Sequence, residues 1–197
     1  MGYEIEFFPV GEASKAGDAI VVRYGVHPNY AVVIIDGGTD ASGEAIVNHV
    51  RNVYGNVTAI DVINSHPDAD HSCGLRHVLR ELPIRQLWVH GLWYHAPHIL
   101  DLFANPRLTI DGLQQAIRAE YPVITELLQI AEDKGVPVAE PFTGAVIGPF
   151  RVLSPNMPTY QHLVPQFRKT PDPNVDLLKQ KQIWLGDATG HGADTII

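Results

Sequence analysis

The order of strand-like and helix-like segments between residues 3 and 90 restricts the fold of this chain more than any other feature. Runs rich in β-branched and aromatic residues predict strands, and apolar residues at helical spacing predict helices. Strands are expected over 3–9, 19–24, 31–35, 59–64 and 85–90, and helices from near Ser42 to Gly55 and over 74–82. This alternation is typical of an α/β sheet that carries helices on its faces, so we expect an α/β fold.

The remainder of the chain is predicted to be helical first and irregular later. A helical stripe runs from Thr109 to Gly135, and Pro122 inside it predicts a kink or a break into two helices. Residues 145–153 predict another strand or hairpin. Repeated prolines predict that 155–182 is a long ordered loop or a partner-covering arm. We expect one domain over 1–197 whose C-terminal part is incomplete, because an α/β domain usually needs further strands to close a second sheet.

The charge balance limits the partners that this chain can bind. With 14 Lys and Arg against 22 Asp and Glu, its formal net charge is -8. A surface of that sign repels polyanions, which argues against a broad nucleic-acid-binding face. It leaves room for an acidic cluster that holds cations, and the 10 histidines are a first indication of one.

Cysteine usage and hydropathy bear on location. The single cysteine, Cys73, has no partner for an intrachain disulfide, which favours a reducing, cytoplasmic location. No run approaches the roughly 18 consecutive apolar residues of a transmembrane helix. The acidic N-terminus also lacks the basic region of a signal peptide. We therefore expect a cytoplasmic protein without membrane contact.

The segment 64–75 carries most of the chemistry. It follows an apolar strand, precedes a helix, and contains four potential metal ligands: His66, Asp68, Asp70 and His71. Strand ends of this kind project into the crevice where α/β proteins place their sites. Adjacent residues point in different directions, so His66 and Asp68 can face one centre while Asp70 and His71 face a second. Two such centres can clamp and activate a water, and this ligand set suits Zn, Mn or Fe. The alternative is a polar loop that caps a helix and is solvated.

Three motifs resemble those of a known family. His66-x-Asp68-x-Asp70-His71 is similar to the H-x-H-x-D-H signature of the metallo-β-lactamase superfamily, with an aspartate in place of the second histidine. More closely, it resembles the metal-hydrolase domain of bacterial competence proteins. Gly17-Asp18-Ala19-Ile20 and Ile35-Asp36-Gly37-Gly38 resemble upstream phrases of the same subgroup. The resemblance implies an αββα sandwich, a binuclear site at the sheet edge, and hydrolysis of esters, thioesters, amides or phosphodiesters.

The resemblance also implies roles for individual residues. His66 and Asp68 would hold the first of two divalent ions, Zn or Mn, and Asp70 and His71 the second. Asp70 would also orient the nucleophilic water or accept its proton, which makes it the candidate catalytic residue, and Asp36 would support the loop. The aspartate at 68 moves the metal preference from Zn toward Mn or Mg.

A later metal ligand is predicted near the C-terminus. The phrase Trp184-Leu185-Gly186-Asp187-Ala188 resembles the segment that carries the aspartate bridging both metals, so Asp187 is a candidate. The alternative at Asp187 is an ordinary Gly-Asp turn. His191 is the late histidine candidate, with simple solvation as the alternative.

Other residues permit functional and structural interpretations alike. His90, His95 and His98 could line the groove or serve in a lid or in packing. Cys73 could be a nucleophile or a small buried filler. Three arginines could attract a phosphate-bearing substrate or form a solvated helix face. They are Arg76, Arg80 and Arg85.

These features together predict a metallo-hydrolase. We expect a metal-bound hydroxide to attack an ester-like bond in a small molecule or a short single-stranded nucleic acid, and the resemblance to the competence-protein subgroup implies a phosphodiester. The alternative is a non-catalytic module of the same fold that binds metal, or a partner through residues 155–182. A third hypothesis is a thiol enzyme that uses Cys73 and is indifferent to chelators. An incomplete second sheet would favour pairing as a homodimer.

Overall fold

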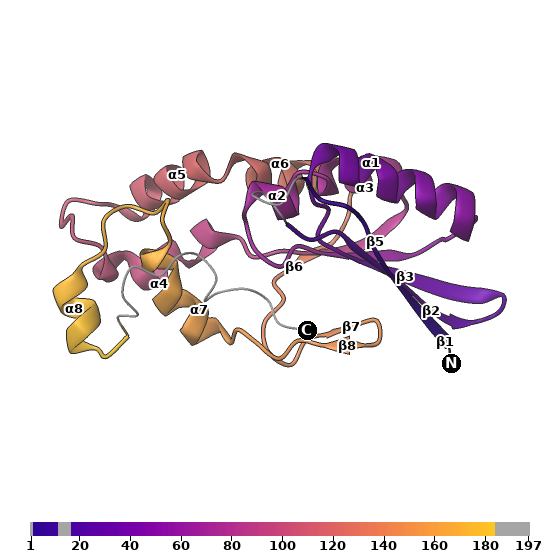
Figure 1. The fold of residues 1–197 in the computed structure, drawn as a ribbon. Coiled ribbons are helices and arrows are strands. Elements are labelled where there is room, and N and C mark those ends of the chain that lie inside the picture. The colour runs from indigo at the N-terminus through magenta and orange to yellow at the C-terminus, as the bar shows by residue number, and fades with distance from the viewer. Residues whose placement is uncertain (1, 12–16, 184–197) are drawn as a thin grey trace.

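A six-stranded sheet forms the centre of the computed structural model, which describes residues 2–11 and 17–183 (Figure 1). The strands lie in chain order: β1 (Gly2–Phe7), β2 (Ile20–Val26), β3 (Asn29–Ile35), β4 (Ile60–Ile63), β5 (Ile84–Trp88) and β6 (Val138–Ala139). The pairs β1–β2 and β2–β3 are antiparallel, and β3 to β6 are parallel. The parallel strands require crossover connections, and helices supply them. The predicted α/β architecture is confirmed.

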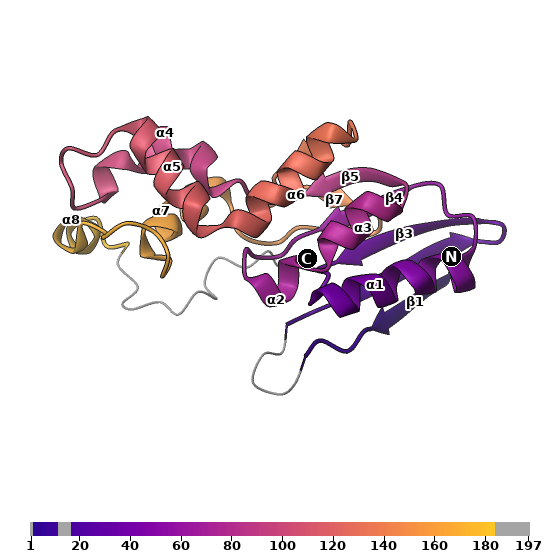
Figure 2. The same ribbon diagram turned by 90° about the horizontal axis from the view of Figure 1, so that it is seen from above.

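Helices cover one face of this sheet. They are α1 (Asp40–His49), α3 (Leu75–Glu81) and α6 (Pro122–Asp133), which lie across the strands in Figure 2. The helix expected near Ser42 begins slightly earlier, because Thr39 is its N-cap and the Thr39 hydroxyl accepts the Ser42 N–H. Its apolar face buries Ile46 and Val47 against the strands.

A short β-hairpin packs on the opposite face of the sheet. Strands β7 (Val146–Ile147) and β8 (Phe150–Arg151) pair antiparallel, as the sequence predicted for 145–153. Their buried side chains form a second, smaller core with Val33 of β3 and Ile63 of β4. The six-stranded sheet therefore lies between the helices on one face and the β7–β8 hairpin on the other. Figure 1 shows these layers from the side.

A lobe of helices extends from one end of the sheet (Figures 1 and 2). It contains α4 (Ala96–Ile99), α5 (Ile110–Glu120), α7 (Met157–Leu163) and α8 (Val175–Gln180). The break predicted at Pro122 is confirmed, since α5 ends before Tyr121 and α6 begins with the proline. Proline suits the first turn of a helix, where its missing N–H has no intrahelical partner.

The structure of residues 155–182 differs from the long loop or partner-covering arm that the sequence predicted. It forms α7, a 3-10 turn and α8, and it buries Tyr160 and Leu178 in the main core. Asn156 caps α7 by accepting the Thr159 N–H at 2.9 Å. The prolines occupy loops and first turns, where they are compatible with helices, so their number was a poor indicator of irregular structure.

The structure was also searched for helices that could span a membrane. Within the described part of the chain, no helix has the length and apolar character needed to cross a bilayer.

Candidate metal centre

The four parallel strands end side by side, and a polar segment follows each. The last residues of β3, β4, β5 and β6 are neighbours in register: Ile35, Ile63, Trp88 and Ala139. The polar residues beyond them include Asp36, the run 64–66, His90 and Glu140. Because parallel strands open their carboxyl ends onto one crevice, these side chains converge at the edge where the sheet meets the helical lobe.

Two histidines from the predicted motif meet at this edge. The rings of His66 and His71 have centroids 3.8 Å apart, and both side chains are buried. His66 lies in the loop after β4, and His71 lies in α2 (Ala69–Ser72). Among residues 2–11 and 17–183, Asp36, His66 and His71 form the one group of metal-ligating side chains whose donor atoms all lie within 4.8 Å of one another.

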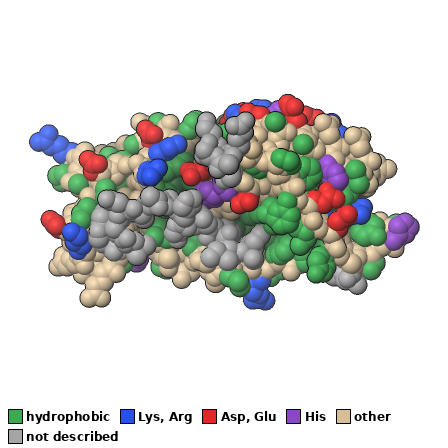
Figure 3. All heavy atoms as spheres, in the orientation of Figure 1, with side chains coloured by type: hydrophobic (Ala, Val, Ile, Leu, Met, Phe, Trp, Pro, Cys, Tyr) green, Lys and Arg blue, Asp and Glu red, His purple; other side chains and the backbone are tan. Residues whose placement is uncertain are grey.

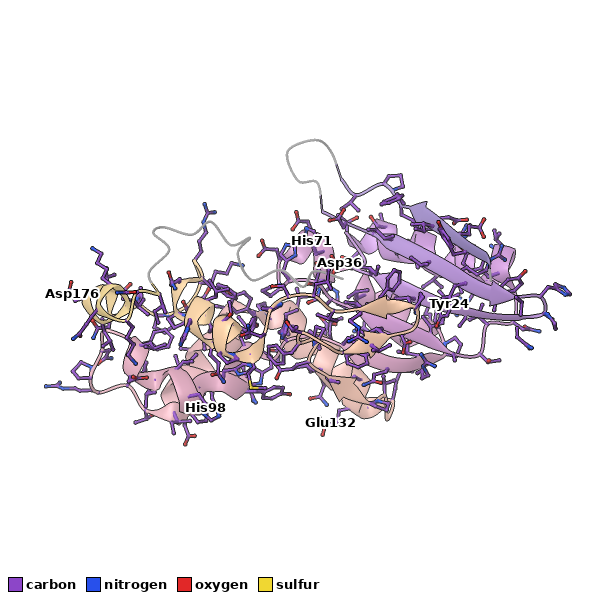
Figure 4. The ribbon with its side chains drawn as sticks, turned by 90° about the horizontal axis from the view of Figure 1, so that it is seen from below. Tyr24, Asp36, His71, His98, Glu132 and Asp176 are labelled. Atoms are coloured by element: carbon purple, nitrogen blue, oxygen red, sulfur yellow. The ribbon has the colours of Figure 1, made fainter. Side chains whose placement is uncertain are left out.

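Asp36 lies beneath the two imidazoles and holds the loop. Its side chain is 1% exposed. Its Oδ1 accepts the Ser65 N–H at 2.7 Å, and its Oδ2 accepts the Ser65 hydroxyl at 2.5 Å and the His71 Nδ1–H at 2.9 Å. Figure 4 shows Asp36 and His71 next to each other. The backbone of Asp36 has φ 55°, a left-handed conformation that non-glycine residues adopt mainly where the surroundings enforce it.

These hydrogen bonds determine which nitrogen of each histidine can bind a metal. The Asp36 carboxylate only accepts, so His71 carries its proton on Nδ1 and has its lone pair on Nε2. The single Ser65 proton goes to Asp36, so Ser65 accepts at its 3.0 Å contact with His66 Nδ1. Neutral His66 therefore also has its lone pair on Nε2. A carboxylate behind a histidine is the common support of metal-binding imidazoles.

The local charges favour a cation at His71. Burial alone would lower the pKa of His71, but the hydrogen bond that His71 donates to Asp36 and the charges of Asp36, Asp70 and Asp18 outweigh it and raise the pKa. The same negative potential that stabilises a proton there stabilises a metal ion. The donor set of two oriented imidazoles with carboxylates nearby fits a divalent ion such as Zn or Mn.

The two aspartates of the motif lie at the rim of this group. Asp68 is the N-cap residue of α2, its side chain is 51% exposed, and its Oδ2 is 3.9 Å from His66 Nε2. Asp70 is half-buried and acts on His71 through its charge. The structure thus brings His66 and His71 together with Asp36, and the division of the four motif residues between two metals stays a prediction. Asp187 lies outside the described residues, and so does His191.

Two residues that the sequence analysis gave no role belong to the site. Ser65 links Asp36 to His66, and it directly precedes the first motif histidine. Asp18 places its Oδ2 4.0 Å from His71 Nδ1. The motif Gly17-Asp18-Ala19-Ile20 starts with glycine for a steric reason. A Cβ at position 17 would lie 1.9 Å from the Asp70 carbonyl oxygen. Only glycine permits that close approach of the two backbones.

Comparison with known families agrees with this geometry. A model of the metallo-beta-lactamase superfamily matches residues 16–162, more than half of the 197-residue chain. The chain belongs to the metallo-β-lactamase superfamily. No curated protein matched it in a search. The resemblance that the motifs predicted is confirmed at the level of the superfamily, while the closer likeness to competence proteins stays a prediction.

Further histidines lie beyond the superfamily motif. His95 Nε2 donates to Glu140 Oε1 at 3.0 Å, and its Nδ1 accepts from Gln161 Nε2 at 3.3 Å. Burial would raise the pKa of Glu140, but hydrogen bonds from His90 and His95 lower it to about 2. His98 is exposed and lies away from Asp36 and His71 (Figure 4). The geometry therefore favours packing for His95 and a surface position for His98.

The remaining candidates have structural partners. Burial raises the pKa of the Cys73 thiol, which disfavours the thiolate that a nucleophile needs. Arg76 and Arg80 both bind the Glu126 carboxylate, and Arg85 binds Asp61. These carboxylates balance the arginine charges, which favours the solvated helix face for Arg76 and Arg80. For Arg85 the helix-face prediction is wrong, because this residue lies in β5. Figure 3 shows a histidine flanked by acidic side chains near the middle of one face.

Proposed function

We propose that this superfamily member is a metal-dependent hydrolase that cleaves a phosphodiester, with two divalent ions, Zn or Mn, at the β4–α2 loop. The observation that carries the proposal is the pair of buried imidazoles at 3.8 Å, oriented by Asp36 and Ser65. The superfamily makes metal-dependent hydrolysis the expected reaction. The phosphodiester rests on the closer likeness of the motifs to the competence-protein subgroup.

The proposed ligands follow the motif. His66 and Asp68 would hold one ion, and His71 and Asp70 the other, with Asp187 as a further candidate. Divalent ions lower the pKa of water and stabilise the charge that develops on the ester oxygens. Asp36 keeps both Nε2 atoms in the ligating state. Asp70 would orient the attacking water and accept its proton.

The charge of the chain bears on the substrate. A net charge of -8 opposes long duplexes, so a small molecule or a short single strand is the preferred phosphodiester. The arginines near α3 are occupied by carboxylates, which removes one means of attracting a polyanion.

The proposal is tested by metal content and hydrolysis measured together. Purified protein should bind Zn²⁺ or Mn²⁺ and hydrolyse bis(p-nitrophenyl) phosphate in a chelator-sensitive reaction. His66→Ala should lose both properties, while His98→Ala, which removes an exposed imidazole away from the site, should keep them. Absence of metal binding by the unaltered protein would overturn the proposal. Metal binding without hydrolysis of phosphodiesters or thioesters would instead support a non-catalytic module of the same fold.

A further inference from the structure

A turn of the helical lobe lies beside the proposed metal centre. Phe167 lines a small pocket together with His66 and Pro67 of the β4–α2 loop. Hydrogen bonds fix the chain that follows Phe167. The Thr170 N–H donates to the Phe167 carbonyl oxygen at 3.1 Å, and the Thr170 hydroxyl donates to the same oxygen at 2.8 Å. Residues 167–170 therefore form a hydrogen-bonded turn at the rim of the site.

This turn carries an exposed cation, Lys169, whose side chain is placed by Tyr121. The Lys169 Nζ lies over the Tyr121 ring, 5.8 Å from its centroid, which is within the range of a cation–π contact. Tyr121 is the N-cap residue of α6, and α2 packs against that helix. Burial raises the pKa of Tyr121, and the negative charge of Asp68 raises it further, which is an effect of proximity. Tyr121 thus connects Lys169 to the rim residue Asp68.

The charge of Lys169 is not balanced by a carboxylate. Among the residues that the structure describes, Lys169 forms no ion pair, although the net charge of the chain is -8. Three arginines near the site differ in this respect, because carboxylates bind them: Arg76, Arg80 and Arg85. A cation–π contact at an exposed site is weak and leaves the ammonium donors open. Lys169 is therefore available to an anionic ligand.

The proposed metal centre determines which anion this is. Asp68 would bind a metal ion, so its charge would not be available to Lys169. The scissile phosphodiester would lie on the two ions, which stabilise its charge. Lys169 is held on the lobe by Tyr121, apart from these ions, so it suits a different anionic group of the same substrate. A phosphate offers an ammonium group both negative charge and several acceptor oxygens.

We propose that Lys169 binds a second phosphate group that the substrate carries beside its scissile phosphodiester. The preferred substrate would then be one with consecutive phosphates, such as a short oligonucleotide, rather than an isolated diester. This specificity rests on the proposed phosphodiester hydrolysis, and Lys169 is the specificity-determining residue. Figure 3 shows Lys or Arg side chains on the same face as the histidine that acidic side chains flank.

The test compares thymidylyl-thymidine, which has only the scissile phosphodiester, with the same dinucleotide phosphorylated at both ends. Only cleavage of the internal phosphodiester is counted, with Zn²⁺ or Mn²⁺ present. The unaltered protein should favour the end-phosphorylated dinucleotide about fivefold in kcat/KM, the upper value for one solvent-exposed ion pair. Lys169→Gln removes the charge and should bring this ratio close to one by slowing only the end-phosphorylated substrate. Lys169→Arg keeps the charge and should keep the preference.

A matched control removes the charge of another exposed lysine. Lys179 lies in α8, and Asp176 of the same helix lies far from His71 in Figure 4, so Lys179→Gln should leave the ratio unchanged.

Three results would overturn the inference and leave phosphodiester hydrolysis standing. They are equal cleavage of the two dinucleotides by the unaltered protein, a preference that survives Lys169→Gln, and equal slowing of both dinucleotides by this variant. Failure to cleave either dinucleotide, by a protein that hydrolyses bis(p-nitrophenyl) phosphate, would overturn it as well. Failure to cleave any of the three compounds would remove the proposed function and the inference with it.

Discussion

Replacing Asp36 by asparagine changes which nitrogen of His71, a candidate metal ligand, carries the proton, while preserving the size of the residue 36 side chain. Asp36 Oδ1 accepts from Ser65 N, and Oδ2 accepts from the Ser65 hydroxyl and from His71 Nδ1. An asparagine offers one oxygen and one NH₂ group. If its oxygen serves the Ser65 N–H, its NH₂ group donates to His71 Nδ1 and drives the His71 proton to Nε2. That proton blocks the atom that would bind the metal.

The expected loss of metal affinity can be calculated from the loss of the carboxylate that orients His71. Removing a group that orients a metal-binding histidine typically lowers metal affinity 10- to 100-fold, which corresponds to about 1.4–2.7 kcal/mol. The opposite orientation of the amide does not restore the original hydrogen bonds, because it leaves the Ser65 N–H facing another N–H donor. We therefore expect Asp36→Asn to weaken Zn²⁺ or Mn²⁺ binding by one to two orders of magnitude.

Competition against a chromophoric chelator measures this affinity, and Asp61→Asn is the matched control. Asp61 is also almost fully buried, but it pairs with Arg85 and lies on β4, before the strand reaches the loop. Asp61→Asn should reduce stability by about 1.5–3 kcal/mol, the value of a hydrogen bond to a charged group, with unchanged metal affinity. Equal metal affinities for Asp36→Asn and the unaltered protein would refute the argument.

Three further predictions concern stability and the alternative chemistry. Glu140 has its pKa lowered to about 2, so its contribution is complete above about pH 4.5 and is lost as the pH falls toward 2. Glu140→Gln should remove at most about 3 kcal/mol at neutral pH and flatten the acid-unfolding curve in that window; an unchanged curve would contradict the stabilising role of the hydrogen bonds to Glu140. Gly74→Ala should cost about 3 kcal/mol or more in denaturant unfolding, because its Cβ would lie 2.0 Å from the Gly37 carbonyl oxygen, whereas Gly2→Ala meets nothing and should be neutral. A stable Gly74→Ala protein would show that this contact is looser than described. Cys73→Ser should retain hydrolysis that chelators abolish and alkylating reagents spare, and a tenfold or greater loss would revive the thiol mechanism.

Local sequence signals predicted the strands, most of the helices and the loop after β4 that brings His66 and His71 together. The alternation up to residue 90 and the break at Pro122 depend on near neighbours in the chain, and the structure follows them. The helices within 155–182 were missed because prolines were interpreted as breaks, although a proline such as Pro158 suits a first turn.

The support of the site was harder to predict because it depends on long-range contacts. The carboxylate beneath the histidines comes from the end of β3, and Asp18 comes from the segment before β2. The proximity of Gly17 to Asp70 joins segments that are far apart in the chain. Only the motif resemblance pointed to Asp36, and nothing in the spacing of residues indicated that Ser65 would determine the tautomer of His66.

The central claim is that Asp36 and Ser65 present the Nε2 atoms of His66 and His71 to a divalent ion. Two-bond ¹H–¹⁵N correlation spectra of the histidine side chains, recorded before and after addition of Zn²⁺, test it most directly. The account predicts that both residues carry their proton on Nδ1 without metal and that both Nε2 resonances shift when Zn²⁺ is added. A proton on Nε2 of either residue, or Nε2 resonances unmoved at saturating Zn²⁺, would contradict it.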